Sequence, residues 1–560
     1  MAAGSTILTN WRAGQERVRR EQAAHREMQQ AMAAFRTHTG RAMPRRAVVP
    51  QKPVEPAFAH VSGQRAFSAA GYDRLAAGWV SHNSGINADL EGQLSVLIAR
   101  SRDWCVNTDI GRRYIQLVKD NVVGATGARL QVRAKLNMQA EALDELGNAT
   151  IERHWLRWCR RGACDVTGQL SFVDICRLVV AQAARDGGYL TRQVRSRSLE
   201  YGYALQVLDI DRLQVNNNAA AGAAAGNTIR MGIEVAPFGV PVAYHLQGSH
   251  PGDAHSLMGS QAGVRRVLAG DVLHGFVAER PEQLRGYPWT AAVLRRANTL
   301  DSYEQYAVQA AKIGAAKMGF YTIDKDAPAD AMEVSDYKDA TGNLVQDVEA
   351  GMLEALPPGV GFESFNPDYP HQNFDSFVTA CLHGVSAGLN VAHHNLTGNM
   401  TGVNYSSARI AELSERQHWM GLQNWLIESF VRPVFEAWLE SALIKGAITL
   451  PSGKALPAET FAKWADAATF QPRRWAWVDP QKDITAAVTA IDNKLRSHRS
   501  VADEQGVDLD DVLDDEARFQ QQLKDKGLSV TKPASPASKP VDPEADDEEN
   551  NTTPPQEDAP

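Results

Sequence analysis

The pentapeptide GVSAG at 384–388 matches GxSxG, the pattern that surrounds the nucleophilic serine of many hydrolases. That chemistry needs the serine on a sharp turn between a strand and a helix, followed along the chain by an acid and a histidine. Here the apolar residues recur at helical spacing from Phe374 to Leu389, and no strand pattern precedes the motif. We therefore predict that Ser386 lies in a helix whose small residues allow close packing, and hydrolysis by Ser386 is the less favoured alternative.

Other reactive residues have part of the spacing of a metal site without its full ligand set. Asp209 and Asp211 form a DxD pair that a strand would place on one face, but no third ligand or phosphate loop accompanies them, so a pair at the end of a strand is the favoured interpretation. His383, His393 and His394 lack the i, i+4 spacing of a helical zinc site. The sequence contains neither GxxxxGK[ST] nor GxGxxG. We predict no catalytic residue, no metal and no cofactor, and hence an assembly component rather than an enzyme.

The composition is that of an ordinary soluble globular protein. The chain has 560 residues, of which 44% are hydrophobic and 22% charged. At roughly 150 residues per domain this length suggests three to four domains. Five cysteines without a CxxC pair favour a reducing, cytosolic setting. No stretch approaches the ~18 apolar residues of a membrane span, and the first twenty residues have no apolar core of signal-peptide length.

The net charge of −8 is distributed unevenly along the chain. Residues 1–60 hold ten Arg and Lys against four Glu, whereas residues 529–560 hold two Lys, eight acids and seven prolines. The pattern of 5–36 is typical of a basic amphipathic helix, and 40–66 resembles an extended linker. Two readings of this arm stay open, a mobile surface tail or a peptide that docks on a partner or on nucleic acid. The acidic body argues against a tight, sequence-reading DNA binder.

The hydrophobic periodicity predicts an α+β protein. Strands with a period of two are expected between 189 and 280, namely YLTRQV, ALQVLDI, IRMGIEV, PVAYHL and DVLHGFV, with a low-complexity loop at 216–226. Helical patterns flank this region on both sides, at about 70–124, around Trp155 and Trp158, and at 172–184, 289–317, 374–389, 405–444 and 484–526. Pro433 is expected to kink or restart the helix that contains it.

The predicted helix at 289–317 is long and rich in alanine. Its apolar and small residues recur at a spacing of three and four, namely at Leu300, Tyr303, Ala307, Ala310 and Gly314. Small residues at such spacing allow neighbouring helices to approach closely. The pattern fits either a buried core helix or a helix that packs against other subunits of an oligomer, and these five residues are the candidates for oligomer packing.

Several longer segments resemble the lambda-type family of tailed-phage portal proteins, the head–tail connectors, over roughly residues 70–525. The segments ARSRDWCVNTDIGRRYIQLVKDNVVGATGARLQ, LQVLDIDRL, IRMGIEVAPFGVPVAYHL, VLHGFVAERPEQLRGYPW, LTGNMTGVNYSSARI and WVDPQKD occur in the order that the family shows. The resemblance implies a ring, usually of twelve subunits, at one vertex of the capsid. Double-stranded DNA enters and leaves through the axis of such a ring. The other candidates are a different phage head or tail ring component and a DNA-binding assembly factor.

The resemblance also implies a division of the chain into the parts of a portal subunit. These are a basic flexible arm (1–66), a wing of helices and a β-rich part (67–288), two stem helices (289–318 and 373–390), a small α/β clip (319–372), a tunnel loop (391–404), a long wing helix with its exit (405–479), a helical crown (480–526) and a disordered acidic, Pro-rich tail (527–560).

The partners that the resemblance implies are further copies of the chain, double-stranded DNA bound without regard to sequence, the terminase large subunit, the major capsid and scaffold proteins, and the head-completion proteins. The expected location is the portal vertex of the virion, with the host cytoplasm during assembly and no membrane. A conduit must let DNA slide, so few basic residues are expected at its lumen. The candidates there are Lys312 and Lys317 on the first stem helix and Asn395, Asn399 and Asn404 on the loop.

Overall fold

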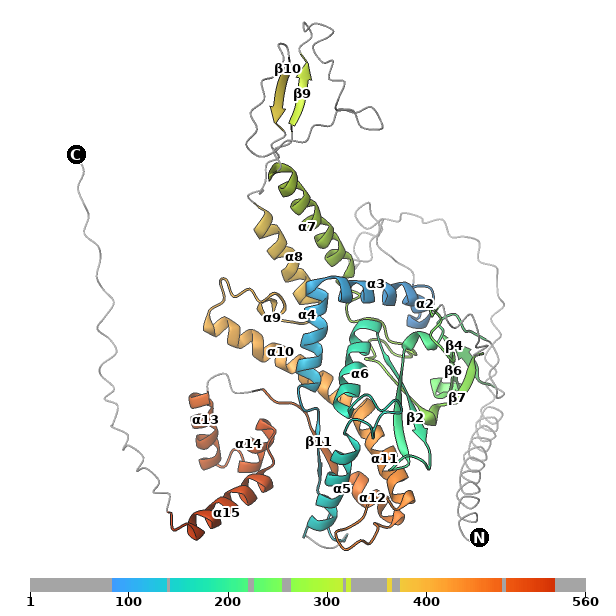
Figure 1. Ribbon diagram of the computed structural model, residues 1–560, viewed down its shortest axis with the longest axis vertical. Coiled ribbons are helices and arrows are strands. Elements are labelled where there is room, and N and C mark those ends of the chain that lie inside the picture. Colours follow the sequence, from blue (N-terminus) through green and yellow to red (C-terminus); the bar gives the residue numbers. More distant parts are fainter. Residues whose placement is uncertain are drawn as a thin grey trace, which may run out of the picture. The chain divides into compact units, whose positions relative to one another are not determined.

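The structure is a computed structural model that describes eight stretches of the chain (Figure 1). These are residues 83–137, 142–219, 226–253, 263–315, 319–323, 360–364, 373–475 and 480–528. The basic arm, nearly all of the acidic tail, the tip of the 216–226 loop, Lys317 and most of 319–372 lie outside them. The described elements belong to one unit that begins at Asn83.

Helices make up about half of the described chain. Their bounds are α2 (Ile86–Glu91), α3 (Leu94–Asn107), α4 (Asp109–Val118), α5 (Glu145–Trp158), α6 (Phe172–Asp186), α7 (Leu294–Ala315), α8 (Phe374–Gly388), α9 (His393–Thr397), α10 (Tyr405–Leu426), α11 (Arg432–Lys445), α12 (Phe461–Asp466), α13 (Pro480–Asp492), α14 (His498–Gln505) and α15 (Leu509–Asp525). Short π-helical turns are η2 (Lys119–Val123) and η7 (Ile427–Val431), and short 3-10 turns are η3 (Ile210–Arg212), η4 (Pro237–Gly239), η6 (Ala269–Asp271) and η8 (Ala458–Thr460).

The strands form four small antiparallel sheets. Their bounds are β1 (Arg129–Val132), β2 (Tyr189–Arg195), β3 (Tyr203–Leu208), β4 (Thr228–Arg230), β5 (Ile233–Val235), β6 (Pro241–Leu246), β7 (Arg265–Leu268), β8 (Val272–Gly275), β9 (Gly319–Ile323), β10 (Val360–Ser364) and β11 (Ala468–Gln471). The orders are β3-β2-β8, β4-β5-β6-β7, β1-β11 and β9-β10. The mixture of helices and sheets confirms the α+β prediction.

Aromatic side chains fill the main core, where α5, α6 and α11 meet the sheet of β2 and β3. The ring of Trp155 lies 5.0 Å from that of Trp158 and 5.1 Å from that of Trp438. The Trp158 indole N–H donates to the carbonyl oxygen of Tyr203 at 3.0 Å, so this buried polar group is paired. Trp155 and Trp158 are therefore anchors of the main core. A second apolar cluster joins α2 and one face of α3 to the β4–β7 sheet.

Local sequence signals explain where α6 begins and ends. Ser171 and Asp174 form a reciprocal capping box at its first turn. Gly187 ends it with a φ of +89°. A Cβ at Gly187 would lie 2.5 Å from backbone atoms of Tyr287, so both the left-handed conformation and the close approach require glycine here.

The region around Pro433 shows how the long helical stretch accommodates a proline. Pro433 has no N–H to donate to the carbonyl oxygen of Ser429, one turn earlier. The π-helical turn η7 lies at this point, and the freed Ser429 oxygen accepts a hydrogen bond of 2.7 Å from the Tyr189 hydroxyl. The predicted kink is thus a π-helical turn between α10 and α11 that binds the helix to β2.

Three sequence-based expectations need correction. The single helix expected up to Gly124 is broken, because Thr108 is extended and caps α4 with its side chain. The segment IRMGIEV is a hairpin, because Met231 and Gly232 have φ of +48° and +81° and form a two-residue turn between β4 and β5. The stretch 484–526 is three helices, α13, α14 and α15, separated at Ser497 and Asp508, whose side chains cap the next helix.

Candidate functional site: the α7–α8 pair and the 391–404 loop

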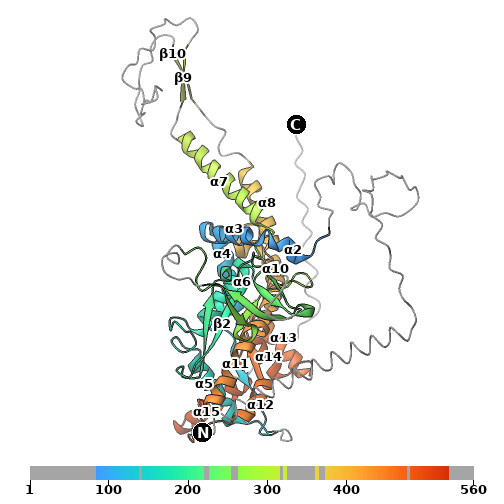
Figure 2. The same cartoon turned by 90° about the vertical axis from the view of Figure 1, so that its right-hand side faces the viewer.

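The GVSAG motif lies inside α8 and packs this helix against α7, as Figures 1 and 2 show for the pair as a whole. A Cβ at Gly388 would lie 2.4 Å from Cγ1 of Val293, and one at Gly384 would lie 1.5 Å from Nη1 of Arg296. The hydroxyl of Ser386 is buried and donates to the carbonyl oxygen of Leu382 at 2.9 Å. The motif is therefore a close helix contact, and the strand-to-helix turn of a hydrolase is not formed here.

The apolar residues of α7 divide between contacts with α8 and solvent. Leu300 is buried, and the ring of Tyr303 packs 5.6 Å from that of Phe374 and 5.1 Å from that of Phe377. Ala307 and Ala310 are partly buried, and Gly314 lies in the last turn. The first two of the five packing candidates thus contact their own chain, and a role of the five in oligomer packing stays a prediction.

A second set of apolar side chains on α7 faces solvent in the single chain. Tyr306 is 70% exposed and Val308 is 52% exposed. Both lie on the helix between Tyr303 and Lys312, and Lys312 is itself exposed. The sequence pattern of small and apolar residues three and four positions apart did not include Tyr306 and Val308. That pattern marks the side of α7 that packs against α8.

The 391–404 loop has an anchored first half and an exposed tip. The first half contains the short helix α9, and its anchor is the buried carboxylate of Glu415 in α10. Oε2 of Glu415 accepts from the backbone N–H of Ala392 at 2.9 Å and from Nδ2 of Asn395 at 2.8 Å. Oε1 accepts from the indole N–H of Trp419 at 2.9 Å. Arg113 of α4 adds a bond to the carbonyl oxygen of Asn395 at 3.2 Å.

The three candidate asparagines of the loop have different structural roles. Asn395 is partly buried, with its amide donated to Glu415. Asn404 caps α10 by accepting from the backbone N–H of Ser407, which leaves its amide group at the surface. Asn399 lies in the exposed tip, and its side-chain oxygen accepts a hydrogen bond from the backbone N–H of Thr401. Asn399 and Asn404 thus have amide groups exposed at the loop, whereas the Asn395 amide supports the loop from within.

The histidines of this region stack instead of converging on a metal ion. The rings of His383 and His393 lie 4.0 Å apart and nearly parallel. Burial lowers the pKa of His393, and the neighbouring His383 and His394 lower it further. His393 is therefore neutral at pH 7, and the stack connects α8 to α9.

The DxD pair binds an arginine. Asp209 directly follows β3, which ends at Leu208, and caps the 3-10 turn that contains Asp211, so the two carboxylates form a pair at the end of a strand. Arg102 donates to Asp209 at 2.9 Å and to Asp211 at 2.6 Å. Nε2 of His250 lies 3.4 Å from Asp211, which completes a group with metal-ligand types. The guanidinium of Arg102 already supplies the positive charge that a metal ion would bring.

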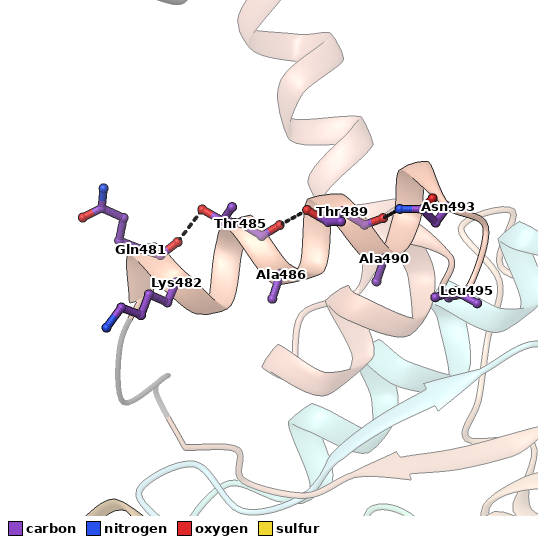
Figure 3. Close-up of a pocket in the computed structure, with 8 residues that line it drawn as sticks. All are labelled: Gln481, Lys482, Thr485, Ala486, Thr489, Ala490, Asn493 and Leu495. Carbon is purple, nitrogen blue, oxygen red and sulfur yellow. Dashed lines mark hydrogen bonds between the residues drawn. The ribbon is translucent and has the colours of Figure 1, made fainter. Parts of the chain in front are cut away.

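A groove of about 760 Å³ runs along α13 (Figure 3). The side chains of Thr485, Thr489 and Asn493 donate to carbonyl oxygens one turn earlier in the same helix. Their polar groups are thereby satisfied, and the groove presents methyl groups of threonine and alanine. This surface can pack against another protein surface, but it presents few polar groups that could bind a ligand or catalyse a reaction. None of the described helices has the length and apolar character needed to cross a lipid bilayer.

Comparison with known proteins gives the family of the chain. A family model described as phage portal protein, lambda family, matches residues 72–423. The chain belongs to the lambda family of phage portal proteins. Portal proteins are structural components of the phage particle, which agrees with the position of Ser386 in the last turn of a helix.

Individual relatives extend the match beyond the family model. A probable portal protein of Halomonas phage phiHAP-1 is 33% identical over 519 residues, which cover 90% of this chain and 96% of the relative. Portal protein B of Escherichia phage lambda is 20% identical and matches 80% of this chain and 88% of its own length. Among solved structures, a chain from the neck of an empty gene transfer agent particle aligns with 74% of this chain and 93% of its own length, at 13% identity and a TM-score of 0.39.

The main feature of this portal chain that sequence reasoning missed is the anchor at Glu415. The residue lies 20 positions after Asn395 in an amphipathic helix, where a glutamate ordinarily indicates a solvated face. A glutamate four residues before Trp419 is the only local hint, since the indole N–H needs an acceptor once it is buried.

Proposed function

We propose that this portal protein assembles into a closed ring of about twelve copies at one capsid vertex, and that double-stranded DNA passes through the axis of the ring. The observation that carries the proposal is the membership of the lambda portal family over residues 72–423. The exposed apolar residues Tyr306 and Val308 on α7 support it, because a ring supplies a neighbour to cover them. A ring needs one surface to meet a different surface on the next subunit.

In this proposal the parts of the chain have separate tasks. The pair α7 and α8 forms the stem, and the segment 319–372, which contains β9 and β10, forms the clip that binds terminase and later the head-completion proteins. Residues 67–288 form most of the wing, and α13, α14 and α15 form the crown. The scaffold and the major capsid protein surround the ring during assembly in the host cytoplasm, and the ring then stays at the portal vertex of the virion.

The lumen of the ring is proposed to bind DNA weakly. Each phosphate that a protein neutralises adds about −0.9 to the salt slope of binding, so many such contacts would hold DNA in place. The exposed Lys312 is the basic candidate on the described part of α7, and Lys317 lies beyond it. Asn399 and Asn404 are the neutral candidates, because their amide groups are exposed.

Electron microscopy of the purified recombinant protein tests the ring. We expect particles of about twelve-fold symmetry with a central hole wide enough for duplex DNA. A stable monomer that still fails to form rings when terminase, scaffold and capsid protein are co-expressed would contradict the proposal.

Charge reversal at Lys312 tests the DNA contact. We expect Lys312→Glu to form intact rings but to package or retain less DNA, because a carboxylate at the lumen repels the phosphates. The matched control is Lys454→Glu, at an exposed lysine in the turn before α12. Equal packaging by Lys312→Glu, Lys454→Glu and the unmodified protein would remove Lys312 from the lumen.

A further inference from the structure

The buried carboxylate of Glu415 holds one half of the 391–404 loop and leaves the other half free. Glu415 is only 6% exposed, and its two oxygens accept three hydrogen bonds, from Ala392, Asn395 and Trp419. An acceptor-only group is needed at this point, because all three partners are donors. Hydrogen bonds to a charged group are stronger than those between neutral groups.

The exposed tip lies between two fixed points. Its first end is Gly398, with a φ of +74°, directly after α9, and its second end is the capping box of Asn404 and Ser407 at the start of α10. The residues between these points include Asn399 and Met400, and Met400 is 63% exposed. The described hydrogen bonds of the tip are short-range, since Gly398 and Asn399 donate to His394 and Thr397 of the adjoining α9 and the others join residues of the tip.

The position of the anchor determines how far the loop can reach. The free tip from 398 to 403 has six residues, and a segment of this length spans at most about 20 Å when extended. Because both of its ends are fixed, its midpoint extends at most about 10 Å from them. A movable segment from 391 to 403, thirteen residues, would let the midpoint reach about twice as far, and Glu415 prevents this together with Val391 and Leu396, which are buried in the main core.

We propose that Glu415 is a positioning residue that limits the movable part of the loop to residues 398–403 and so sets how far the loop reaches toward DNA. Arg113 supports the same clamp from α4 through the carbonyl oxygen of Asn395. The consequence for DNA rests on the proposed portal function, whereas the local clamp does not.

Hydrogen–deuterium exchange on the full-length protein tests the clamp itself. We expect Glu415→Gln to speed exchange of the amides in 392–397 at least tenfold, because the glutamine amide places a donor against donors. Exchange in 398–403 should change little, since the tip is already free. The matched control is Glu412→Gln, which removes only an i, i+4 pair with Arg416 on the same helix.

A swap of donor and acceptor separates positioning from general stability. In the double variant Glu415→Gln with Asn395→Asp, the glutamine amide donates to the new carboxylate and restores the bond between the two side chains in reverse. We expect this variant to recover much of the protection in 392–397. Unchanged exchange in Glu415→Gln, or equal loss of protection throughout α10, would overturn the proposal.

DNA retention in filled heads then tests the consequence. We expect the fraction of heads that retain DNA to differ between Glu415→Gln rings and Glu412→Gln rings. The double variant Glu415→Gln with Asn395→Asp should recover part of this difference. If the clamp opens in the exchange experiment but all heads behave alike, the loop does not control DNA. If neither the unmodified protein nor any variant is incorporated into heads, the proposed portal function is wrong instead.

Discussion

The surroundings of His274 shift its pKa far from the ordinary value of a histidine. His274 in β8 packs its ring 5.5 Å from those of Tyr244 and Phe276, and its Nε2 is buried without a hydrogen-bond partner among the described groups. Burial, together with the smaller effect of the nearby Arg285, lowers the pKa of His274 to about 3. The imidazole is therefore neutral in the folded protein at every pH above about 3.

This burial predicts a pH dependence of stability. The unfolded chain binds a proton at His274 near its ordinary pKa of about 6.5, whereas the folded chain does not, so stability is lost as the pH falls below about 6.5. Between pH 8 and pH 5 the contribution of His274 amounts to about 2 kcal/mol. We expect His274→Phe to show a smaller fall in thermal midpoint over this range than the unmodified protein. His498→Phe, at an exposed histidine, is the control and should not alter the fall.

The candidate loop residues show what a sequence leaves open at this scale. Asn395, Asn399 and Asn404 were indistinguishable as polar residues of one loop, and all three were predicted to face DNA. Their roles differ because Glu415, far along the chain, faces only the first of them, and because Asn404 happens to start a helix. A side chain's partner depends on tertiary geometry, which the spacing of residues within a loop does not contain.

At the scale of elements, the α7–α8 contact depends on the size of the residues in one motif. The two glycines of GVSAG face different neighbours, the branched Val293 and the flexible end of Arg296. An alanine at either position favours the helix by about 1 kcal/mol over glycine. An added methyl group against a fixed, branched neighbour costs about 1–3 kcal/mol.

These terms predict opposite results for two neighbouring substitutions. Gly388→Ala should lower the thermal midpoint, because its methyl group meets Val293, and Gly388→Ala with Val293→Ala should recover part of the loss. Gly384→Ala should leave the midpoint equal or higher, because the exposed guanidinium of Arg296 can move into solvent. Thermal unfolding followed by circular dichroism measures both. Equal losses in the two single variants would show that the helix contact is not set by Val293.

The elements that the sequence predicted best are those with long apolar periodicity, such as α6, α8 and the α10–α11 stretch. Short elements without such periods were missed or merged. The strand β11 has four residues and pairs with β1, more than 300 residues away, so its partner is not visible locally. The break at Thr108 was missed because a single capping side chain interrupts an otherwise continuous apolar pattern.

At the scale of the whole molecule, the family membership and the exposed apolar residues of α7 both bear on whether the chain assembles into a ring. Tyr306 and Val308 are two positions apart and so point to different sides of α7, and each exposes apolar area that a neighbouring chain can cover. Single exposed apolar residues are common, but here they lie on a helix of a portal-family protein that is proposed to line a ring. Covering them in the ring would favour assembly, since apolar burial is worth about 25 cal/mol per Å².

We therefore expect Tyr306→Glu with Val308→Glu to prevent ring formation without unfolding the chain. Two carboxylates would have to leave water at the contact, which costs far more than the apolar burial gains. The matched control is Gln305→Glu with Gln309→Glu, which adds the same charge at exposed polar positions of the same helix. Sedimentation velocity should show monomers for the first variant and rings for the control, with equal helix content by circular dichroism. Rings formed by the first variant would place the contact between subunits elsewhere on the chain, and monomers in both variants would mean that added charge anywhere on α7 opposes assembly.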